Sequence, residues 1–585
     1  MGMKRTTIPY FDGVNSLVEH NISKKTEPEQ AENARSVKIG SLEKRKGYSV
    51  IGNDISAVAN YGLFYFESAL SSKYLWQASR VGAVTNLYYL SNSSVWTILA
   101  GFGANLSNVN VETAIAENNL FFVNGTDTNR YINGSDGITV TDSTTVLGHL
   151  YGSPKAFKIN YYKDRLYLGD YLVGTNRYKN GMMMSSKPLG IVALVDGDIT
   201  AGTDQVTVTD TKYIYTASDQ LDVYRGGTLI TTLTITAKKE YSVTVSGTTS
   251  VTLQSADELW VKNTYTTSPR VFRWATNPAT GTSVKRYDTF KLGGGANSSL
   301  NMMTNIGDIM AISNKDCFMT WNDSALTNYD SEIGCVSPRG FIKSNNILFF
   351  VNYSGVYATT GGAPKLVSSK VQAYFDGATT AGLEASSAGA KGTSVFFSIG
   401  SVTLYNNDGS VNKTLANVCL EYNMRQENWF VHTNIPASKF SKYISAGPSE
   451  VAFTNNSNFK IYNFLNGQDD AGSEIPFALL FENIGLLSEF EKFVYVHKLI
   501  IEVEAGNNGQ VFVSVDGGEF YQLKDSINKG VNIITVNPRT PASENDLVRC
   551  KKISVAIKEF SKGSFKVSRF AIVYADSLET EEHSK

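Results

Sequence analysis

The stretch NNILFFVNYSGVYATTGG, residues 345–362, carries the pattern that decides the fold. Two turn-forming asparagines precede an apolar and aromatic run, a turn follows, and a second run leads to a pair of glycines. Short runs of β-branched and aromatic residues between Asn and Gly turns are typical of β-hairpins. The segment therefore predicts two adjacent antiparallel strands.

The same unit recurs along the chain. Related runs begin at Tyr61 (YGLFYFE), Asn118 (NNLFFVNG), Lys163 (KDRLYLGD), Gly307 (GDIMAISN), Thr393 (TSVFFSIG) and Ser449 (SEVAFTNN). Successive units lie roughly 40 to 60 residues apart, with one gap of about 144. Repeats of this length made only of strands are typical of β-propeller blades, and about six to eight blades fit the chain. A series of β-sandwiches is the alternative.

Changes in residue composition and in apolar–polar alternation divide the chain further. Residues 190–264 are Thr- and Val-rich strand with Gly turns and account for the long gap, which predicts a small β domain inserted in a blade loop. Residues 475–578 alternate strongly between apolar and polar, which predicts a C-terminal β-sandwich. Short helices are expected only at Glu27–Ser36 and Ser369–Phe375.

The predicted fold class is therefore all-β: a β-propeller with an inserted small β domain and a C-terminal β-sandwich. The expected divisions are 1–52 (N-terminal extended segment and first propeller edge), 53–189 (first propeller blades), 190–264 (inserted β-barrel or sandwich), 265–474 (remaining blades), 475–578 (C-terminal β-sandwich) and 579–585 (polar tail).

Composition excludes several classes of protein. With 53 Lys and Arg against 54 Asp and Glu, the net charge of −1 argues against a general nucleic-acid coat but allows a local basic patch. No signal peptide and no run of 18 apolar residues is evident, so no membrane contact is expected. The four cysteines form no CxxC pair and indicate a reducing compartment: Cys317, Cys335, Cys419 and Cys550.

No catalytic, cofactor-binding or metal-binding residues are predicted. A glycosidase needs two facing carboxylates, but isolated acids sit in turns, where they are common: Asp164, Asp170, Asp219 and Asp308. SVDGGEFY (514–521) has the spacing of an Asp-box, which favours a structural turn. LGGGANSS (292–299) lacks the Lys-Ser/Thr ending of a phosphate-binding loop. GMMMSS (181–186) indicates a packed or partner-facing segment.

A basic cluster near the start is the candidate site. In NARSVKIGSLEKRKGY, residues 33–48, the cationic residues are Arg35, Lys38, Lys44, Arg45 and Lys46. One interpretation is a solvated turn that keeps a sheet edge soluble. The other is contact with DNA phosphates or an acidic neighbouring protein, strengthened if a ring of copies faces one channel. On that second interpretation, charge reversal of Lys44, Arg45 and Lys46 should leave the monomer folded but impair ring assembly or DNA retention.

Two segments resemble a known family, the tail nozzle or packaged-DNA stabilization proteins of short-tailed bacteriophages. The opening, Glu27 and Pro28 followed by NARSVKIGSLEKRKGY, is similar to the family's pattern of Asn, then Gly-Ser-Leu/Ile-Glu-Lys-Arg, then Gly-Tyr. The stretch GCVSPRGFIKSNNILFFVNYSGVYATTGGAPKLVSSKV, residues 334–371, resembles a second family pattern. SPRVFRWATNP (268–278) and GDIMAISNKDCFMTW are similar to the segment before it.

This resemblance implies a non-enzymatic virion protein without cofactors. It implies a hexameric ring below the portal and adaptor proteins, through which double-stranded DNA leaves and by which packaged DNA is retained. Expected partners are further copies of the chain, the portal–adaptor ring, tail fibres or other tail proteins, and DNA bound through its backbone. The expected location is the virion tail, assembled in the host cytoplasm. The alternative is a carbohydrate-binding or glycan-processing propeller at a phage tail tip or a cell surface.

Overall fold

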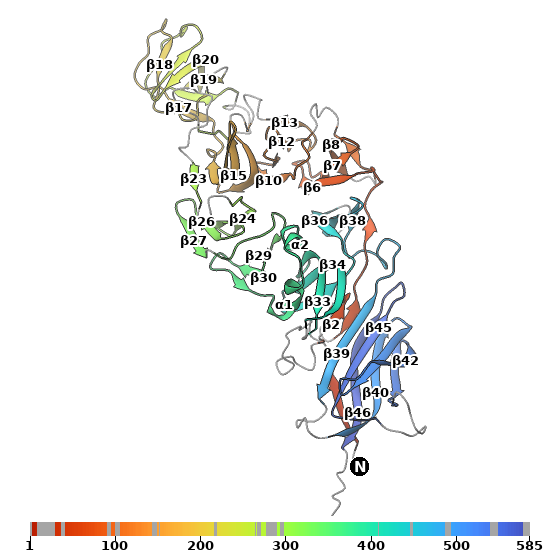
Figure 1. Ribbon diagram of the computed structural model, residues 1–585. Helices are drawn as coiled ribbons and strands as arrows, with labels where there is room; N and C mark the ends of the chain where they lie inside the picture. The colour runs from red at the N-terminus through yellow and green to blue at the C-terminus, as the bar shows by residue number, and fades with distance from the viewer. Residues whose placement is uncertain are drawn as a thin grey trace, which may run out of the picture.

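The structure, a computed structural model, consists of mostly antiparallel sheets that follow one another around a ring, with a β domain at either end (Figure 1). This confirms the all-β fold class predicted from the repeated strands. The structure describes residues 3–8, 28, 30–36, 41–90, 95–99, 106–142, 149–150, 153–215, 219–263, 265, 271–275, 289–292, 298–330, 332–406, 409–444, 449–485, 493–538 and 548–576.

Seven four-stranded sheets, the blades, form the ring within the described residues; six are separate sheets and one belongs to a larger sheet. Blades 1 to 3 consist of β6 (Ala59–Glu67), β7 (Lys73–Val81), β8 (Val84–Leu90) and β9 (Thr97–Ile98); β10 (Glu112–Ala116), β11 (Asn119–Val123), β12 (Arg130–Ile132) and β13 (Val140–Asp142); β14 (Lys155–Tyr162), β15 (Arg165–Val173), β16 (Asn176–Met184) and β23 (Thr289–Lys291).

The remaining four blades continue in chain order. They consist of β24 (Met302–Ile306), β25 (Ile309–Ser313), β26 (Phe318–Trp321) and β27 (Leu326–Asp330); β28 (Phe341–Ser344), β29 (Ile347–Asn352), β30 (Gly355–Thr359) and β31 (Lys365–Leu366); β32 (Ser387–Lys391), β33 (Ser394–Tyr405), β34 (Val411–Asn423) and β35 (Asn428–His432); β36 (Ala437–Tyr443), β37 (Glu450–Asn455), β38 (Ile461–Asn463) and β5 (Ser49–Val50). The first strand of most blades packs against the first strand of the next, around the ring axis.

Turn chemistry explains why the sequence unit repeats. In three blades the first hairpin turns at two successive residues that both have positive φ: residues 117–118 (46° and 59°), 163–164 (44° and 61°) and 345–346 (47° and 62°). Two positive φ values in a two-residue loop give a type I′ turn, whose twist matches that of the paired strands. Asn and Asp tolerate this conformation and occupy four of these six positions, so the turn residues recur with the strands.

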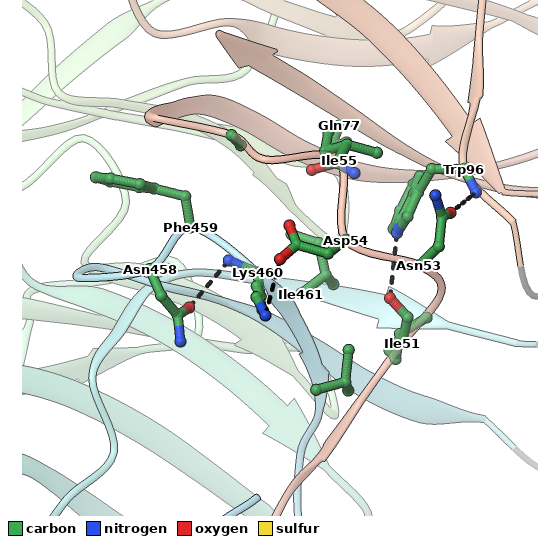
Figure 2. A pocket seen from close by; sticks show the side chains of 12 residues that line it. Ile51, Asn53, Asp54, Ile55, Gln77, Trp96, Asn458, Phe459, Lys460 and Ile461 are labelled. Atoms are coloured by element: carbon green, nitrogen blue, oxygen red, sulfur yellow. Dashed lines mark hydrogen bonds and ion pairs between the residues drawn. The ribbon is translucent and has the colours of Figure 1, made fainter. Parts of the chain in front are cut away.

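The ring is closed by a strand from near the N-terminus, since β5 is the fourth strand of blade 7. The chain then crosses to blade 1 beside Trp96, whose Nε1 donates to the carbonyl of Ile51 at 3.1 Å (Figure 2). The Asn53 side chain accepts from the backbone amide of Trp96 at 2.6 Å. Gly52 has a φ of 71°, and a Cβ there would lie 2.5 Å from the indole nitrogen. The adjacent cavity measures about 10 Å³, room for at most one water, so this interface is structural.

The inserted domain is a six-stranded sheet between β16 and β23 of blade 3, at one end of the molecule (Figure 1). Its strands are β17 (Ile191–Leu194), β18 (Gln205–Thr207), β19 (Asp219–Arg225), β20 (Thr228–Lys239), β21 (Ser242–Val245) and β22 (Glu258–Val261). Its apolar core consists almost wholly of its own side chains. At its base, the buried guanidinium of Arg273 contacts both carboxylate oxygens of Asp219, at 2.6 and 3.0 Å.

Two packed sheets form the C-terminal sandwich, and the N-terminal segment contributes to both. The strands are β39 (Phe477–Gly485), β40 (Val494–Ala505), β41 (Gly509–Val515), β42 (Tyr521–Ile527), β43 (Gly530–Thr535), β44 (Val548–Cys550), β45 (Lys552–Glu559) and β46 (Lys566–Asp576), joined by β1 (Met3–Ile8), β2 (Gln30–Glu32), β3 (Ala34–Arg35) and β4 (Leu42–Lys44).

The propeller and the sandwich share one sheet. β2 lies between β35 of blade 6 and β39 of the sandwich, so nine strands from both parts are continuous. One apolar cluster runs through both, from Phe397 and Trp429 in blade 6 to Phe477 and Phe570 in the sandwich. A shared sheet and core hold the two parts in a fixed orientation.

The structure also tests the predictions made for the two short helices and for three short motifs. The helix expected at Glu27–Ser36 is wrong, because the described part of this segment forms β2 and β3. Ser369–Phe375 does contain a 3₁₀ helix (Ser369–Val371) followed by α1 (Gln372–Asp376), and α2 (Thr380–Glu384) comes next.

The Met-rich segment is packed, since Met182 and Met183 are buried. In SVDGGEFY, Asp516 has a φ of 48° in the turn between β41 and β42, and its carboxylate accepts from the backbone amides of Lys551 and Lys552, so its role is structural. Most of LGGGANSS lies outside the described residues.

Candidate functional site

The basic cluster predicted from the sequence is not a surface patch. The ammonium of Lys44, at the end of β4, lies 2.8 Å from Oε2 of Glu559 at the end of β45. Both side chains are almost fully buried, and the ammonium also donates to the backbone carbonyl of Ser561. A buried ammonium with a carboxylate partner is a structural ion pair. Lys44 therefore joins the N-terminal segment to the sandwich.

Arg45 joins the same segment to the propeller. Its two terminal nitrogens contact the two carboxylate oxygens of Asp470, at 2.7 and 2.5 Å, and its Nε donates to Asn33 Oδ1 at 2.7 Å. A fourth bond goes to the backbone carbonyl of Thr433 at 2.9 Å. Arginine suits this position because its planar fork binds a carboxylate through two parallel hydrogen bonds. Beside it, a Cβ on Gly47 would lie 1.7 Å from a backbone oxygen, so the motif's glycine allows the close approach.

A third buried group involves Arg35. Its guanidinium lies 2.8 Å from Glu421, which also contacts His432 Nε2 at 2.8 Å. Burial alone would raise the pKa of Glu421, but the Arg35 charge and the His432 hydrogen bond lower it to about 2. Burial lowers the pKa of His432, so the neutral ring donates its Nε2–H to the carboxylate. We call these three groups, formed by Arg35, Lys44 and Arg45 with their partners, the N-terminal joint.

The prediction that the basic cluster contacts DNA or a neighbouring subunit is therefore wrong for Lys44 and Arg45. Both are buried in ion pairs within one chain, so neither side chain can reach a phosphate. Arg35 is partly exposed, but its charge is paired with Glu421. Lys46 is exposed, and Lys38 lies outside the described residues. Because Lys44 and Arg45 are buried in ion pairs, we now expect charge reversal there to destabilise the monomer itself.

A pocket of about 200 Å³ opens on the ring axis, and we call it the axial pocket. It is lined by five blades: β6, the start of β10, the residues around β28, β32 and β36. Its charged side chains are Glu112, Arg339 and Lys439. From a sixth blade, Lys158 reaches Glu112, with 2.7 Å between the ammonium and Oε1. No sequence motif unites this group, because its members come from strands about 50 to 330 residues apart.

The isolated acids considered as catalytic candidates are not brought together. Asp170 pairs with Arg177, Asp219 with Arg273, and Asp164 lies at the surface beside Lys187. In the described ranges no group of three or more His, Cys, Asp or Glu side chains could hold a metal ion. The four cysteines are free and buried, and no helix in the described part is long and apolar enough to cross a membrane.

Comparisons with known proteins give no family assignment. No family model and no curated protein matches the chain. Solved structures that it resembles include "YCF48 bound to D1 peptide" (TM-score 0.32, 8% identity, 71% of this chain and 94% of that one). Others are the endosialidase of phage phi92 (0.24, 11%, 66% and 67%) and an ancestral GH74 enzyme (0.17, 10%, 88% and 79%). At these scores the likeness does not bear on function, and the propeller rests on the sheet pairing described above.

Proposed function

We propose that this chain is a non-enzymatic structural subunit of a short phage tail, forming with further copies the nozzle ring below the portal and adaptor. The observation that carries the proposal is the N-terminal joint. The segment that resembles the nozzle family, residues 33–48, supplies the buried pairs of Lys44 and Arg45 that hold propeller and sandwich together. A rigid, elongated subunit with β domains at both ends suits an assembly that must withstand the pressure of packaged DNA.

The route of DNA follows from the size of the axial pocket. The major groove of a duplex alone is about 12 Å wide. A cube with that edge would enclose a far larger volume than the 200 Å³ or so of the pocket. A duplex cannot enter the centre of one propeller. The channel of a nozzle would therefore lie between subunits, lined by surface residues such as Lys46 and not by the buried cations.

Immunogold electron microscopy tests the proposal, using antibody against the full chain on particles of the phage that encodes it. We expect gold at the short tail immediately below one capsid vertex. Pre-immune serum on the same grids is the control. Gold on peripheral fibres, or on no particle, would contradict the nozzle function.

A carbohydrate-binding propeller is the second candidate, and the axial pocket is the observation that favours it. The pocket combines Glu112 and Arg339 with the aromatic rings of Phe341 and Phe440. Sugars bind to such sites through polar contacts at the edge and aromatic contacts at the face of the ring. A glycan array probed with the purified chain tests this candidate, and the absence of any bound glycan would remove it.

A further inference from the structure

The axial pocket contains a buried cation without an anionic partner. Lys439, on β36, is only 5% exposed. Its ammonium donates to the backbone oxygen of Asn60 at 2.7 Å and approaches Asn60 Oδ1 at 3.3 Å. Both acceptors are neutral, and among the described residues no carboxylate lies within ion-pair distance of this ammonium. The hydrogen-bond acceptors of Lys439 are therefore neutral, and Glu112 acts on it only through its charge at longer range.

A second cation lies in the same pocket. Arg339 donates from one terminal nitrogen to Asn110 Oδ1 at 3.2 Å, and its buried Nε has no hydrogen-bond partner. Guanidinium does not lose its proton in proteins, so this half-buried group keeps its positive charge. Among the described residues that line the pocket, the one carboxylate is Glu112, and it is already paired with Lys158 at 2.7 Å. The Glu112–Lys158 pair is neutral as a whole, so it leaves the charges of Arg339 and Lys439 without a counterion.

The burial of these two cations favours binding of an anion between them. Burial, and then the charge of Arg339, hold the pKa of Lys439 well below its usual value. Burial also lowers the pKa of Arg339. Buried cations are costly unless they are paired and hydrogen-bonded. An anion between these two residues would supply the missing charge and an acceptor for the free Nε–H.

We propose that the axial pocket binds a small oxyanion, a carboxylate or phosphate group on a ligand no larger than a single sugar ring, between Arg339 and Lys439. The volume of about 200 Å³ sets the size limit, since a cavity of about 150 Å³ holds one benzene ring. Phe341 and Phe440 line the same pocket and supply apolar contacts for the uncharged part of the ligand. This inference rests on the pocket alone and is independent of the nozzle function.

Calorimetric titration of the full chain tests the proposal with three probes: D-glucuronate, inorganic phosphate and neutral D-glucose. We expect at least one of the two oxyanions to bind at least tenfold more tightly than glucose. Glucuronate alone would identify a carboxylate ligand, and phosphate alone a phosphate ligand. Binding of neither oxyanion, or binding of glucose as tightly as the tighter of the two oxyanions, would overturn the proposal.

Two variants assign the binding to the pocket. Lys439→Met and Arg339→Gln should each weaken oxyanion binding at least tenfold. Lys442→Gln is the matched control, because Lys442 is an exposed lysine on the same strand. Lys439→Met should keep or raise the unfolding temperature, since it removes a buried unpaired charge. Should Lys439→Met fail to fold, Arg339→Gln decides alone. Affinities equal to that of Lys442→Gln would overturn the assignment.

Discussion

The change Arg45→Met should weaken the connection between propeller and sandwich. It removes the two bonds to Asp470, at 2.7 and 2.5 Å, and leaves that carboxylate buried without its cation. Breaking a buried pair by removing one partner costs about 3–5 kcal/mol. For a cooperative unit of about 150–250 residues this lowers the unfolding temperature by roughly 6–20 °C.

A double-mutant cycle separates the ion pair from general packing. Arg45→Met, Asp470→Leu and the double variant are unfolded by heat in a calorimeter, and the first transition is compared with that of the unaltered protein. The double variant should lose far less stability than the sum of the single variants, because an apolar pair leaves no buried charge. Lys46→Met, at an exposed neighbouring position, should shift the transition by less than about 2 °C. The reasoning is refuted if Arg45→Met costs less than about 1 kcal/mol, or if the single effects add.

Three further perturbations test other parts of the structure. The pKa of Glu421 is lowered from 4.5 to about 2 in the fold, so its contribution to stability is present above about pH 4.5 and is lost as the pH falls towards 2. Thermal melts between about pH 5 and 3 should therefore show a steeper loss for the unaltered protein than for Glu421→Gln; equal slopes would contradict this. Gly52→Ala should cost more than about 1 kcal/mol because of the contact with the indole ring, measured against Gly82→Ala, where φ is also positive but no atom lies within 4 Å. Asp219→Asn should cost about 3–5 kcal/mol because it removes the carboxylate charge that the buried guanidinium of Arg273 contacts, and hydrogen exchange should accelerate in the inserted domain while blades 5 to 7 stay protected.

The propeller was predictable because its blades are local. Each hairpin is specified by apolar runs and by turn residues that tolerate positive φ, as at residues 345–346, and both signals lie within about twenty residues of sequence. The number of blades needed the structure, since the repeats are weak and β5 completes blade 7 from the other end of the chain.

The joint and the axial pocket were not predictable in the same way. The acidic start of Glu27–Ser36 favours a helix, but the conformation of β2 within this segment is set by β35 and β39, whose residues lie some 400 positions away. Tertiary pairing overrides local propensity in such segments. The cations of the basic cluster were visible in the sequence, but their partners, such as Glu559, were not. In the axial pocket, one residue is unusual in the sequence. Lys439 is a lysine on β36 that lies two positions after Ala437, and both side chains are buried.

The N-terminal joint also determines when the molecule can be completed. Lys44 and its partner Glu559 are separated by 515 residues, and at about 5–20 residues per second the ribosome needs roughly 25–100 s to make the intervening chain. During that time the early blades can fold, but β2 and β5 have no strands to pair with, because their partners β35, β38 and β39 come late in the chain. The first part of the protein to be synthesised is among the last to reach its place, so nascent chains spend most of translation with an open propeller and an unpaired β-strand that chaperones or neighbouring chains can bind.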